Sequence, residues 1–313
     1  MAEHTCPSSF LDAAQTARAL PYLALSHSVR ELLQDPTVSV PPRIVQPLAH
    51  GGSLFVMPAA DEQVAITKLI TFVADNAARG LPAIQGDVVV FDARDGRRRV
   101  TLDGPTVTAR RTAAVSLRAA LELAPAPQGP LLIVGAGVQG RSHLEAFVQG
   151  LGVREVRIAS RSAASADALV AHARSLGVQA ERCDDADAAL ADCSLVVSCT
   201  SAQDVALRGT PRDDAFVCAV GAFTPRMVEW APEVCRHMAR HGRVVVDTRD
   251  ADHEAGDLLQ AGLDVAAFPA LADVVNQRPL WQDQARRGGP VFFKSCGWAG
   301  WDLAAARCCV ATI

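Results

Sequence analysis

The chain of 313 residues lacks the features that mark several classes of protein. No apolar run approaches the roughly 18 to 20 residues that cross a bilayer. The first residues, MAEHTCPSSF, include an acid and have no apolar segment typical of a secretory signal. The formal net charge of −4 gives no overall attraction to nucleic acid or to anionic membranes. We therefore expect a cytoplasmic protein with neither a nucleic-acid nor a membrane partner.

Metal and disulfide signatures are also missing. The chain has nine cysteines but no C-x-x-C pair, and several cysteines lie inside apolar runs such as SLVVSCT. Small buried thiols in a reducing compartment are the simplest interpretation. His237 and His241 have a spacing that could hold a metal on a helix, but no third ligand accompanies them. No metal site is predicted.

Lysine is the scarcest cation. Of 30 lysines and arginines, only Lys68 and Lys294 are lysine. A chain that fills its surface with arginine keeps lysine where a compact, titratable ammonium is required. Lys68, in the alternating segment AITKLITF, is the stronger candidate for a role in proton transfer.

The pattern of predicted secondary structure changes near residue 130. Residues 11–34 have apolar positions at helical spacing, and residues 43–103 are rich in strand-forming segments, with a hairpin expected at Asp95-Gly96. A long helix is predicted over 106–124, followed by PAPQGP (125–130) as the best candidate for a linker.

After residue 130, apolar strands alternate with helical segments. Strands are predicted over 131–136, 155–160, 194–200, 215–221 and 243–247. Continuous apolar strands separated by helices are typical of a parallel sheet that is covered on both faces. The C-terminal stretch from FFKSCG is predicted to form a loop and then a helix. The fold class is therefore α/β, with a doubly wound parallel sheet of the Rossmann type and a smaller α+β region.

The segment LLIVGAGVQGRSHLEAF contains the pattern G-x-G-x-x-G at Gly135, Gly137 and Gly140. The pattern alone is weak evidence, but here it follows an apolar strand and begins a helix. In that context the glycines allow a tight turn, a close approach of a pyrophosphate to the backbone, and close packing of the helix on the strand. We expect this loop to bind a dinucleotide.

The residues at the end of the next strand favour NADP(H) over NAD(H). A site for NAD places Asp or Glu there to bind the ribose hydroxyls. This chain instead has Ser160, Arg161 and Ser162, and an arginine with two hydroxyls suits a 2′-phosphate. NAD(H) remains possible.

The chain resembles the ornithine cyclodeaminase/mu-crystallin family over nearly its whole length. The resemblance rests on PPRIVQP (41–47), LFVMPA (54–59), TKLITF (67–72), ARRTAAVS (109–116), GAGVQGRSH (135–143), VGAFTP (220–225), EAGDLL (254–259) and FKSCGWAGWD (293–302). It implies a homodimer with two domains. Residues 1–118 with 292–313 would bind the substrate and form the dimer, and residues 119–291 would be the Rossmann domain that binds the cofactor.

The resemblance also implies roles for individual residues. The family's set of carboxylate-binding residues matches Arg43, Lys68 and Arg111, which we expect to clamp the carboxylate of an amino-acid-like substrate. Positions that look like the family's cofactor contacts, together with Val138 in the glycine loop, are Gln139, Thr200, Val220 and Ser295. Glu254 is a weaker match.

One position departs from the ornithine cyclodeaminases. Where those enzymes have an aspartate after the fifth Rossmann strand, this chain has Phe223, which cannot move a proton. The sequence therefore resembles the imine-reducing branch, and we expect an NADPH-dependent reductase of small cyclic ketimine carboxylates, either Δ1-pyrroline-2-carboxylate or Δ1-piperideine-2-carboxylate, giving L-proline or L-pipecolate. Two alternatives stay open: an ornithine cyclodeaminase or amino-acid dehydrogenase, in which Glu229 or Glu254 would replace the missing base, and a non-enzymatic NADPH- and ligand-binding protein.

Overall fold

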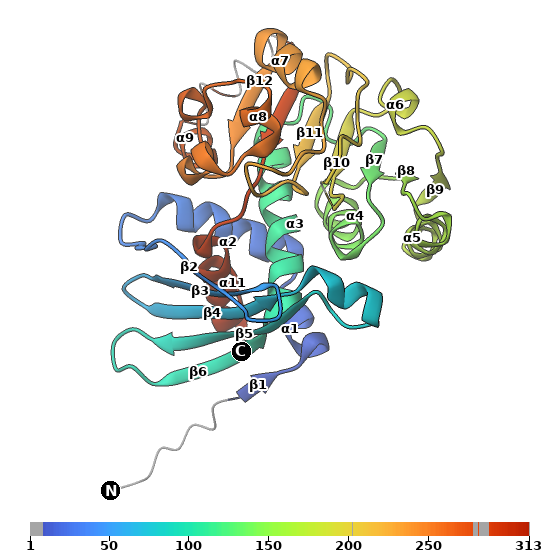
Figure 1. Ribbon diagram of the computed structural model, residues 1–313. Coiled ribbons are helices and arrows are strands. Elements are labelled where there is room, and N and C mark those ends of the chain that lie inside the picture. The colour runs from blue at the N-terminus through green and yellow to red at the C-terminus, as the bar shows by residue number, and fades with distance from the viewer. Residues whose placement is uncertain (1–8, 202, 278–280, 282–287, 313) are drawn as a thin grey trace, which may run out of the picture. The chain divides into compact units, whose positions relative to one another are not determined.

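A computed structural model describes residues 9–201, 203–277, 281 and 288–312, and the chain forms two compact units (Figure 1). Unit 1 combines Met1–Arg111 with Trp298–Ile313, and unit 2 is the continuous segment Thr112–Gly297. The assignment of substrate binding and dimerisation to one part of the chain, and of cofactor binding to the other, stays a prediction.

Unit 1 is built on a six-stranded sheet with the order β1-β6-β5-β4-β3-β2. The strands are β1 (Ser9–Leu11), β2 (Ile44–Pro47), β3 (Ser53–Ala60), β4 (Val64–Phe72), β5 (Ile84–Asp92) and β6 (Arg98–Asp103). Neighbours from β2 to β6 pair antiparallel, whereas β1 lies parallel to β6. The hairpin predicted at Asp95-Gly96 is confirmed, because β5 and β6 pair on either side of it and Gly96 has φ of 74° in the turn.

The helices of unit 1 are α1 (Ala13–Ala19), α2 (Tyr22–Gln34), the 3₁₀ helix η1 (Ala74–Arg79), the first two turns of α3 (Gly104–Leu123) and α11 (Ala299–Thr312). The single helical segment expected over 11–34 is two helices. Pro21 has no amide hydrogen and disfavours helical geometry at Leu20, so the first helix ends there. Helix α11 packs against α2, β3 and β4 and is buried on nearly every side.

Unit 2 contains a seven-stranded parallel sheet with the order β12-β13-β11-β10-β7-β8-β9. The strands are β7 (Leu131–Val134), β8 (Glu155–Ala159), β9 (Gln179–Arg182), β10 (Leu195–Ser198), β11 (Phe216–Ala219), β12 (Arg243–Val246) and β13 (Val291–Lys294). Five of them coincide with strands predicted from the sequence. Strand β13 was predicted as a loop, yet it lies inside the sheet between β11 and β12.

The helical segments of unit 2 are the rest of α3, α4 (Val138–Leu151), α5 (Ala163–Ser175), α6 (Ala186–Ala189), α7 (Pro232–His241), η2 (Arg249–His253), α8 (Gly256–Gln260), η3 (Val265–Ala267) and α9 (Leu271–Asn276). The expectation that PAPQGP is a linker is wrong. This segment is a short connection from α3 to β7 inside unit 2, and the boundary between the units falls within α3 itself.

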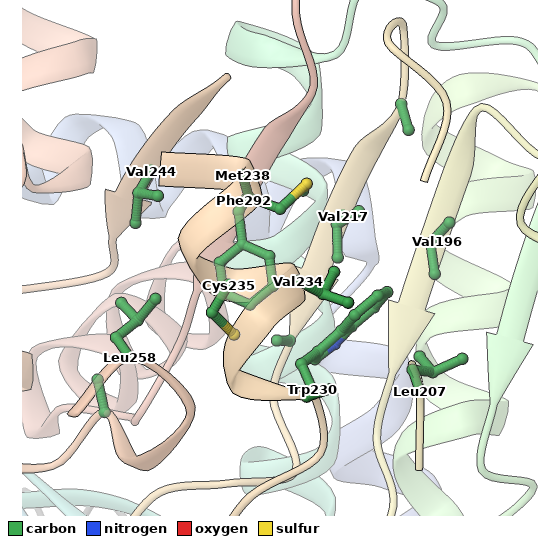
Figure 2. Close-up of a cluster of buried hydrophobic side chains, with 14 of the residues drawn as sticks. Val196, Leu207, Val217, Trp230, Val234, Cys235, Met238, Val244, Leu258 and Phe292 are labelled. Carbon is green, nitrogen blue, oxygen red and sulfur yellow. The ribbon is translucent and has the colours of Figure 1, made fainter. Parts of the chain in front are cut away.

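A buried apolar cluster fills the part of unit 2 where α7 and α8 cover the sheet (Figure 2). Trp230 meets the ring of Phe292 edge-on, with centroids 5.9 Å apart. Val196 and Val217 contribute from β10 and β11, and Val234 from α7. Full burial of these side chains accounts for the all-apolar strands seen in the sequence. Across the described ranges, no helix is long and apolar enough to cross a membrane.

Candidate functional site

The residues predicted to contact a cofactor follow the carboxyl ends of five parallel strands of unit 2. Gly135 follows β7, Ser160 follows β8 and Thr200 lies two residues beyond β10. Val220 follows β11, and Ser295 follows β13. The parallel pairing brings all five to one edge of the sheet, which is where doubly wound folds bind nucleotides.

The three glycines of the loop have different reasons to be glycine. Gly135 has φ of 115°, and a Cβ on it would lie 2.6 Å from the carbonyl oxygen of Cys199. A Cβ on Gly140 would lie 2.0 Å from the carbonyl oxygen of Gly135. The packing of the loop itself therefore requires glycine at both positions.

Gly137 differs, because its φ of −85° suits any residue and a Cβ there would meet no described atom within 4 Å. It is the N-cap of α4, and the next residue, Val138, is 72% exposed. The protein's own packing gives no reason for glycine at this position. An open, positively polarised helix start next to it has the form of a cradle for a phosphate group.

His143, one turn into α4, is a structural residue. Its side chain is fully buried, with Nδ1 2.8 Å from the carbonyl oxygen of Gln139 and Nε2 2.8 Å from Oγ of Ser116. Burial lowers the pKa of His143 to about 4, so the ring is neutral at physiological pH and fixes the first turn of α4.

At the end of β8, Arg161 is exposed and donates a hydrogen bond from Nη2 to Oγ of Ser201 at 3.0 Å. Ser162 is the N-cap of α5, and its Oγ accepts from the amide of Ser165. Oγ of Ser160 accepts from the amide of Ser162. Arg161 and Ser162 are both exposed, but the Ser162 hydroxyl already caps a helix.

A fully buried carboxylate, Glu229, connects the loops after β10 and β11. Its Oε1 accepts from the amide and the hydroxyl of Thr200, and its Oε2 accepts from Oγ of Ser198 and the amide of Gly221. Burial raises the pKa of Glu229, and the nearby Lys294 opposes that effect. With four donors on its two oxygens, Glu229 is a scaffold for these loops.

Lys294 and Asp257 form a buried ion pair near Glu229. Nζ of Lys294 lies 2.8 Å from Oδ2 of Asp257, and both side chains are fully buried. Burial alone would lower the pKa of Lys294, but the charges of Asp257 and Glu229 outweigh it and raise the pKa, so the ammonium stays protonated. Asp257 also accepts, through Oδ1, the amides of Glu229 and Trp230.

The loop after β13 is held by Asp247. Its Oδ2 accepts from the hydroxyl of Ser295 and from the amides of Cys296 and Gly297. Ser295, assigned to the cofactor from the family resemblance, therefore directs its hydroxyl to a buried carboxylate, as Thr200 does. A cofactor contact of either residue would use other atoms.

In unit 1, two of the three residues expected to clamp a carboxylate meet at one buried aspartate. Nζ of Lys68, from the middle of β4, lies 2.8 Å from Oδ2 of Asp302. Nε of Arg111, from α3, donates to Oδ1 of the same residue at 3.3 Å. Asp302 is fully buried in the first turn of α11. Arg43, which is half-buried, is close enough for its charge to lower the pKa of Lys68.

The protonation of Lys68 depends on its neighbours. Burial lowers its pKa, Asp302 raises it, and Arg111 and Arg43 lower it again, with the result that the pKa of Lys68 is about 8. An ammonium with this pKa is mostly charged at neutral pH and can still give up its proton. Lys68 and Arg111 share the single carboxylate of Asp302, so these three residues carry one excess positive charge, which favours an anionic ligand.

Sequence reasoning missed Asp302 and Asp247, although signals for both exist. Asp302 is the one acidic residue in the final segment WDLAAARCCVATI, and an acid surrounded by apolar residues on a helix must find a cation. Asp247 directly follows the strand RVVV, whose last three residues are apolar, at the sheet edge where the other predicted site residues gather.

The remaining residues singled out in the sequence, Phe223 and the pair His237 and His241, lie in structural surroundings. Phe223 is partly buried and packs against the apolar cluster of unit 2. The rings of His237 and His241 are 4.6 Å apart on α7. Within the described ranges, no group of three or more His, Cys, Asp or Glu side chains could hold a metal ion.

Comparison with known proteins adds three findings. The family model of the ornithine cyclodeaminase/mu-crystallin family matches residues 18–311. The chain is 39% identical to Delta(1)-pyrroline-2-carboxylate reductase 1 of Burkholderia multivorans over 95% of this chain and 93% of that protein, and 34% identical to ketimine reductase mu-crystallin of Rattus norvegicus over 87% and 85%. The fold matches that of Delta(1)-pyrroline-2-carboxylate reductase of Thermococcus litoralis in complex with NADH and L-proline, with a TM-score of 0.86, 21% identity and coverage of 97% of each chain.

Proposed function

The chain belongs to the ornithine cyclodeaminase/mu-crystallin family, and we propose that it is an NADPH-dependent reductase of small cyclic ketimine carboxylates. It is an oxidoreductase that acts on a C=N bond, as the activities named for its bacterial and mammalian relatives indicate. The substrate would be of the Δ1-pyrroline-2-carboxylate or Δ1-piperideine-2-carboxylate type, and the product L-proline or L-pipecolate.

The observation that carries this proposal is the buried cation cluster of unit 1. Reduction of a ketimine carboxylate requires one group that holds the carboxylate and one proton for the imine nitrogen. Arg111 and Arg43 supply cationic forks for the carboxylate. Lys68, with a pKa of about 8, supplies a proton that it holds at neutral pH and can release.

The glycine loop of unit 2 supports the assignment of the cofactor. The open position at Gly137 and the start of α4 would hold the pyrophosphate, and Arg161 would pair with the 2′-phosphate that distinguishes NADPH from NADH. When bound, the dinucleotide supplies the hydride for the imine carbon. Ser160 and the backbone around Thr200, Val220 and Ser295 would contact other parts of it.

Turnover of ornithine is disfavoured by two residues. Deamination with ring closure needs a base that moves protons between two amines, and Phe223 stands where ornithine cyclodeaminases have an aspartate. Glu229, one of the two candidates to replace that base, already accepts four hydrogen bonds in a fully buried position. Release of these bonds would leave buried donors without a partner, at about 1 to 3 kcal/mol each.

A panel of imines tests the proposal directly. Oxidation of NADPH should be clear with a five- or six-membered cyclic ketimine carboxylate, and much weaker with the same ring lacking its carboxylate. Tight binding of NADPH without turnover of any imine in the panel would instead favour a ligand-binding protein.

Three substitutions separate the roles in the cluster. Arg43→Ala and Arg111→Ala should raise KM for the imine and leave the Kd for NADPH unchanged, because they act on the carboxylate. Lys68→Arg keeps the charge but loses a proton donor that titrates near neutral pH, so its effect should fall mainly on kcat. Full turnover by Lys68→Arg would exclude Lys68 as the acid.

We also propose a homodimer, formed through the outer face of the unit 1 sheet. Ile44, Val56 and Leu69 lie side by side on β2, β3 and β4, and Ile44 and Leu69 are 60% and 45% exposed. Side chains alternate along a strand, so this apolar row points away from the face that carries Lys68. Light scattering at micromolar concentration should give a dimer mass, and Leu69→Glu should shift it toward the monomer.

A further inference from the structure

Asp302 contacts two of the three cations that the proposed reaction needs from unit 1, Lys68 and Arg111. Its two carboxylate oxygens are divided between them, Oδ2 facing Nζ of Lys68 and Oδ1 accepting from Nε of Arg111. The three residues come from different elements, β4, α3 and α11. A single side chain from the last helix thus fixes the directions of two groups that are far from it in the sequence.

The geometry leaves both cations able to bind a second partner. An ammonium has three protons and Asp302 faces one side of it. A guanidinium has five N–H groups, and the one used by Asp302 is on Nε, so the two terminal nitrogens are not taken by this carboxylate. Asp302 can therefore orient Lys68 and Arg111 without blocking the clamp.

The charge of Asp302 is as important as its position. Lys68 is fully buried, and the charged groups that face it from the surrounding elements are Asp302 on α11, Arg111 on α3 and Arg43 ahead of β2. Burial and the two arginines all favour the neutral amine. Asp302 is the single one of these neighbours that favours the ammonium.

We propose that Asp302 is a positioning residue that orients Lys68 and Arg111 and keeps Lys68 protonated at neutral pH, so that the proton for the imine nitrogen is in place before the substrate binds. The proposal rests on the proposed function for the identity of the proton acceptor. The effect of Asp302 on Lys68 can be tested without turnover.

Because the chain has so few lysines, the titration of Lys68 can be followed by NMR without overlapping signals. Lys68 and Lys294 are the only lysines of the chain, so protein labelled with ¹³C at lysine Cε gives two side-chain NMR signals, and Lys68→Arg identifies which is which. The signal of Lys294, whose ammonium is paired with Asp257, serves as an internal reference for the folded state. The signal of Lys68 should titrate with a midpoint near its pKa of about 8.

Asp302→Asn retains the shape of the side chain and removes its charge. The midpoint of Lys68 should then fall by roughly one pH unit or more, since one favourable charge at contact distance is lost beside two arginines. The alkaline limb of the kcat profile for imine reduction should move to lower pH by the same amount. The Kd for NADPH should not change.

The matched control is Asp61→Asn. Oδ2 of Asp61 lies 2.6 Å from Nε of Arg307, so this substitution also removes a carboxylate that pairs with α11 and leaves the Lys68 pair intact. It should lower stability without moving the Lys68 midpoint. If Asp302→Asn fails to fold, loss of the reference signal of Lys294 will reveal it, and Asp302→Glu, which retains the charge, should restore a midpoint near that of the unsubstituted protein.

The outcomes are distinct. An unchanged or higher midpoint in folded Asp302→Asn would overturn the inference. A lowered midpoint of the Lys68 titration, in a protein that reduces no imine, would support the role of Asp302 and contradict the proposed function.

Discussion

Acid should destabilise this protein through His143, and the size of the effect can be worked out from its surroundings. The ring is fully buried between Gln139 and Ser116, and burial lowers its pKa from 6.5 to about 4. In the unfolded chain the same ring takes up a proton below about pH 6.5. Between these two values the unfolded state binds the proton and the folded state does not, so the stability falls as the pH is lowered.

The two pKa values give the magnitude. From pH 7 to pH 5, His143 should remove about 2 kcal/mol from the free energy of unfolding, and about 3 kcal/mol once the pH is below both values. Other groups also respond to acid, so the informative quantity is a difference between variants. His143→Gln retains a hydrogen-bonding group toward Ser116 but cannot titrate.

Urea unfolding at pH 7, 6 and 5, followed by tryptophan fluorescence, measures this difference. His143→Gln should be less stable at pH 7 but should lose about 2 kcal/mol less than the unsubstituted protein on going to pH 5. His241→Gln, at an exposed position of α7, is the control and should show the same loss as the unsubstituted protein. If His143→Gln lost as much stability as the unsubstituted protein, the assignment of a neutral, buried imidazole would be wrong.

Three further predictions concern the cofactor and the substrate. Arg161→Ala should weaken the binding of NADPH by about 1.5 to 3 kcal/mol, the range of a charge-assisted hydrogen bond, and the exposed setting of Arg161 favours the lower end. The binding of NADH should hardly change. Equal losses for the two cofactors in fluorescence titrations would exclude a contact with the 2′-phosphate. Gly137→Ala should leave the melting temperature nearly unchanged and weaken the binding of either dinucleotide by roughly 5- to 30-fold, because the added methyl group fills space that no described atom occupies. Gly140→Ala, in contrast, should lower the melting temperature. Unaltered binding by Gly137→Ala would argue against a phosphate cradle at this position. Ornithine should be turned over at trace level at most, and Phe223→Asp should not improve imine reduction; efficient release of ammonia from ornithine by the unsubstituted protein would contradict our assignment.

Local sequence patterns predicted the parts of the fold that depend on neighbouring residues. The apolar strands of unit 2, the Asp95-Gly96 hairpin and the strand–glycine–helix segment all follow from short stretches of chain. Strand β13 could not be found in this way. The run VFFK is short, is followed by a glycine-containing loop, and becomes a strand because it pairs with β11 and β12 from distant parts of the chain.

In the candidate site, too, the sequence predicted what local patterns indicate and missed what depends on distant residues. The scarcity of lysine singled out Lys68, and the structure places it in a fully buried ion pair. Its partner Asp302 lies more than two hundred residues away, and no spacing rule connects the two. The buried carboxylates Glu229 and Asp247 were likewise not predictable as scaffolds, because their roles depend on which backbone amides the fold directs at them.

The order in which unit 1 is assembled has a consequence for synthesis of the protein. The ribosome makes the sheet that carries Lys68 first, then the whole of unit 2, and only afterwards α11 with Asp302. Unit 2 is continuous and can complete its sheet while the chain is still growing, as domains generally fold as units. Until α11 emerges, the inner face of the unit 1 sheet exposes apolar residues and an unpaired ammonium. We therefore expect nascent unit 1 to be the part that chaperones bind, and folding to finish in the opposite order to translation.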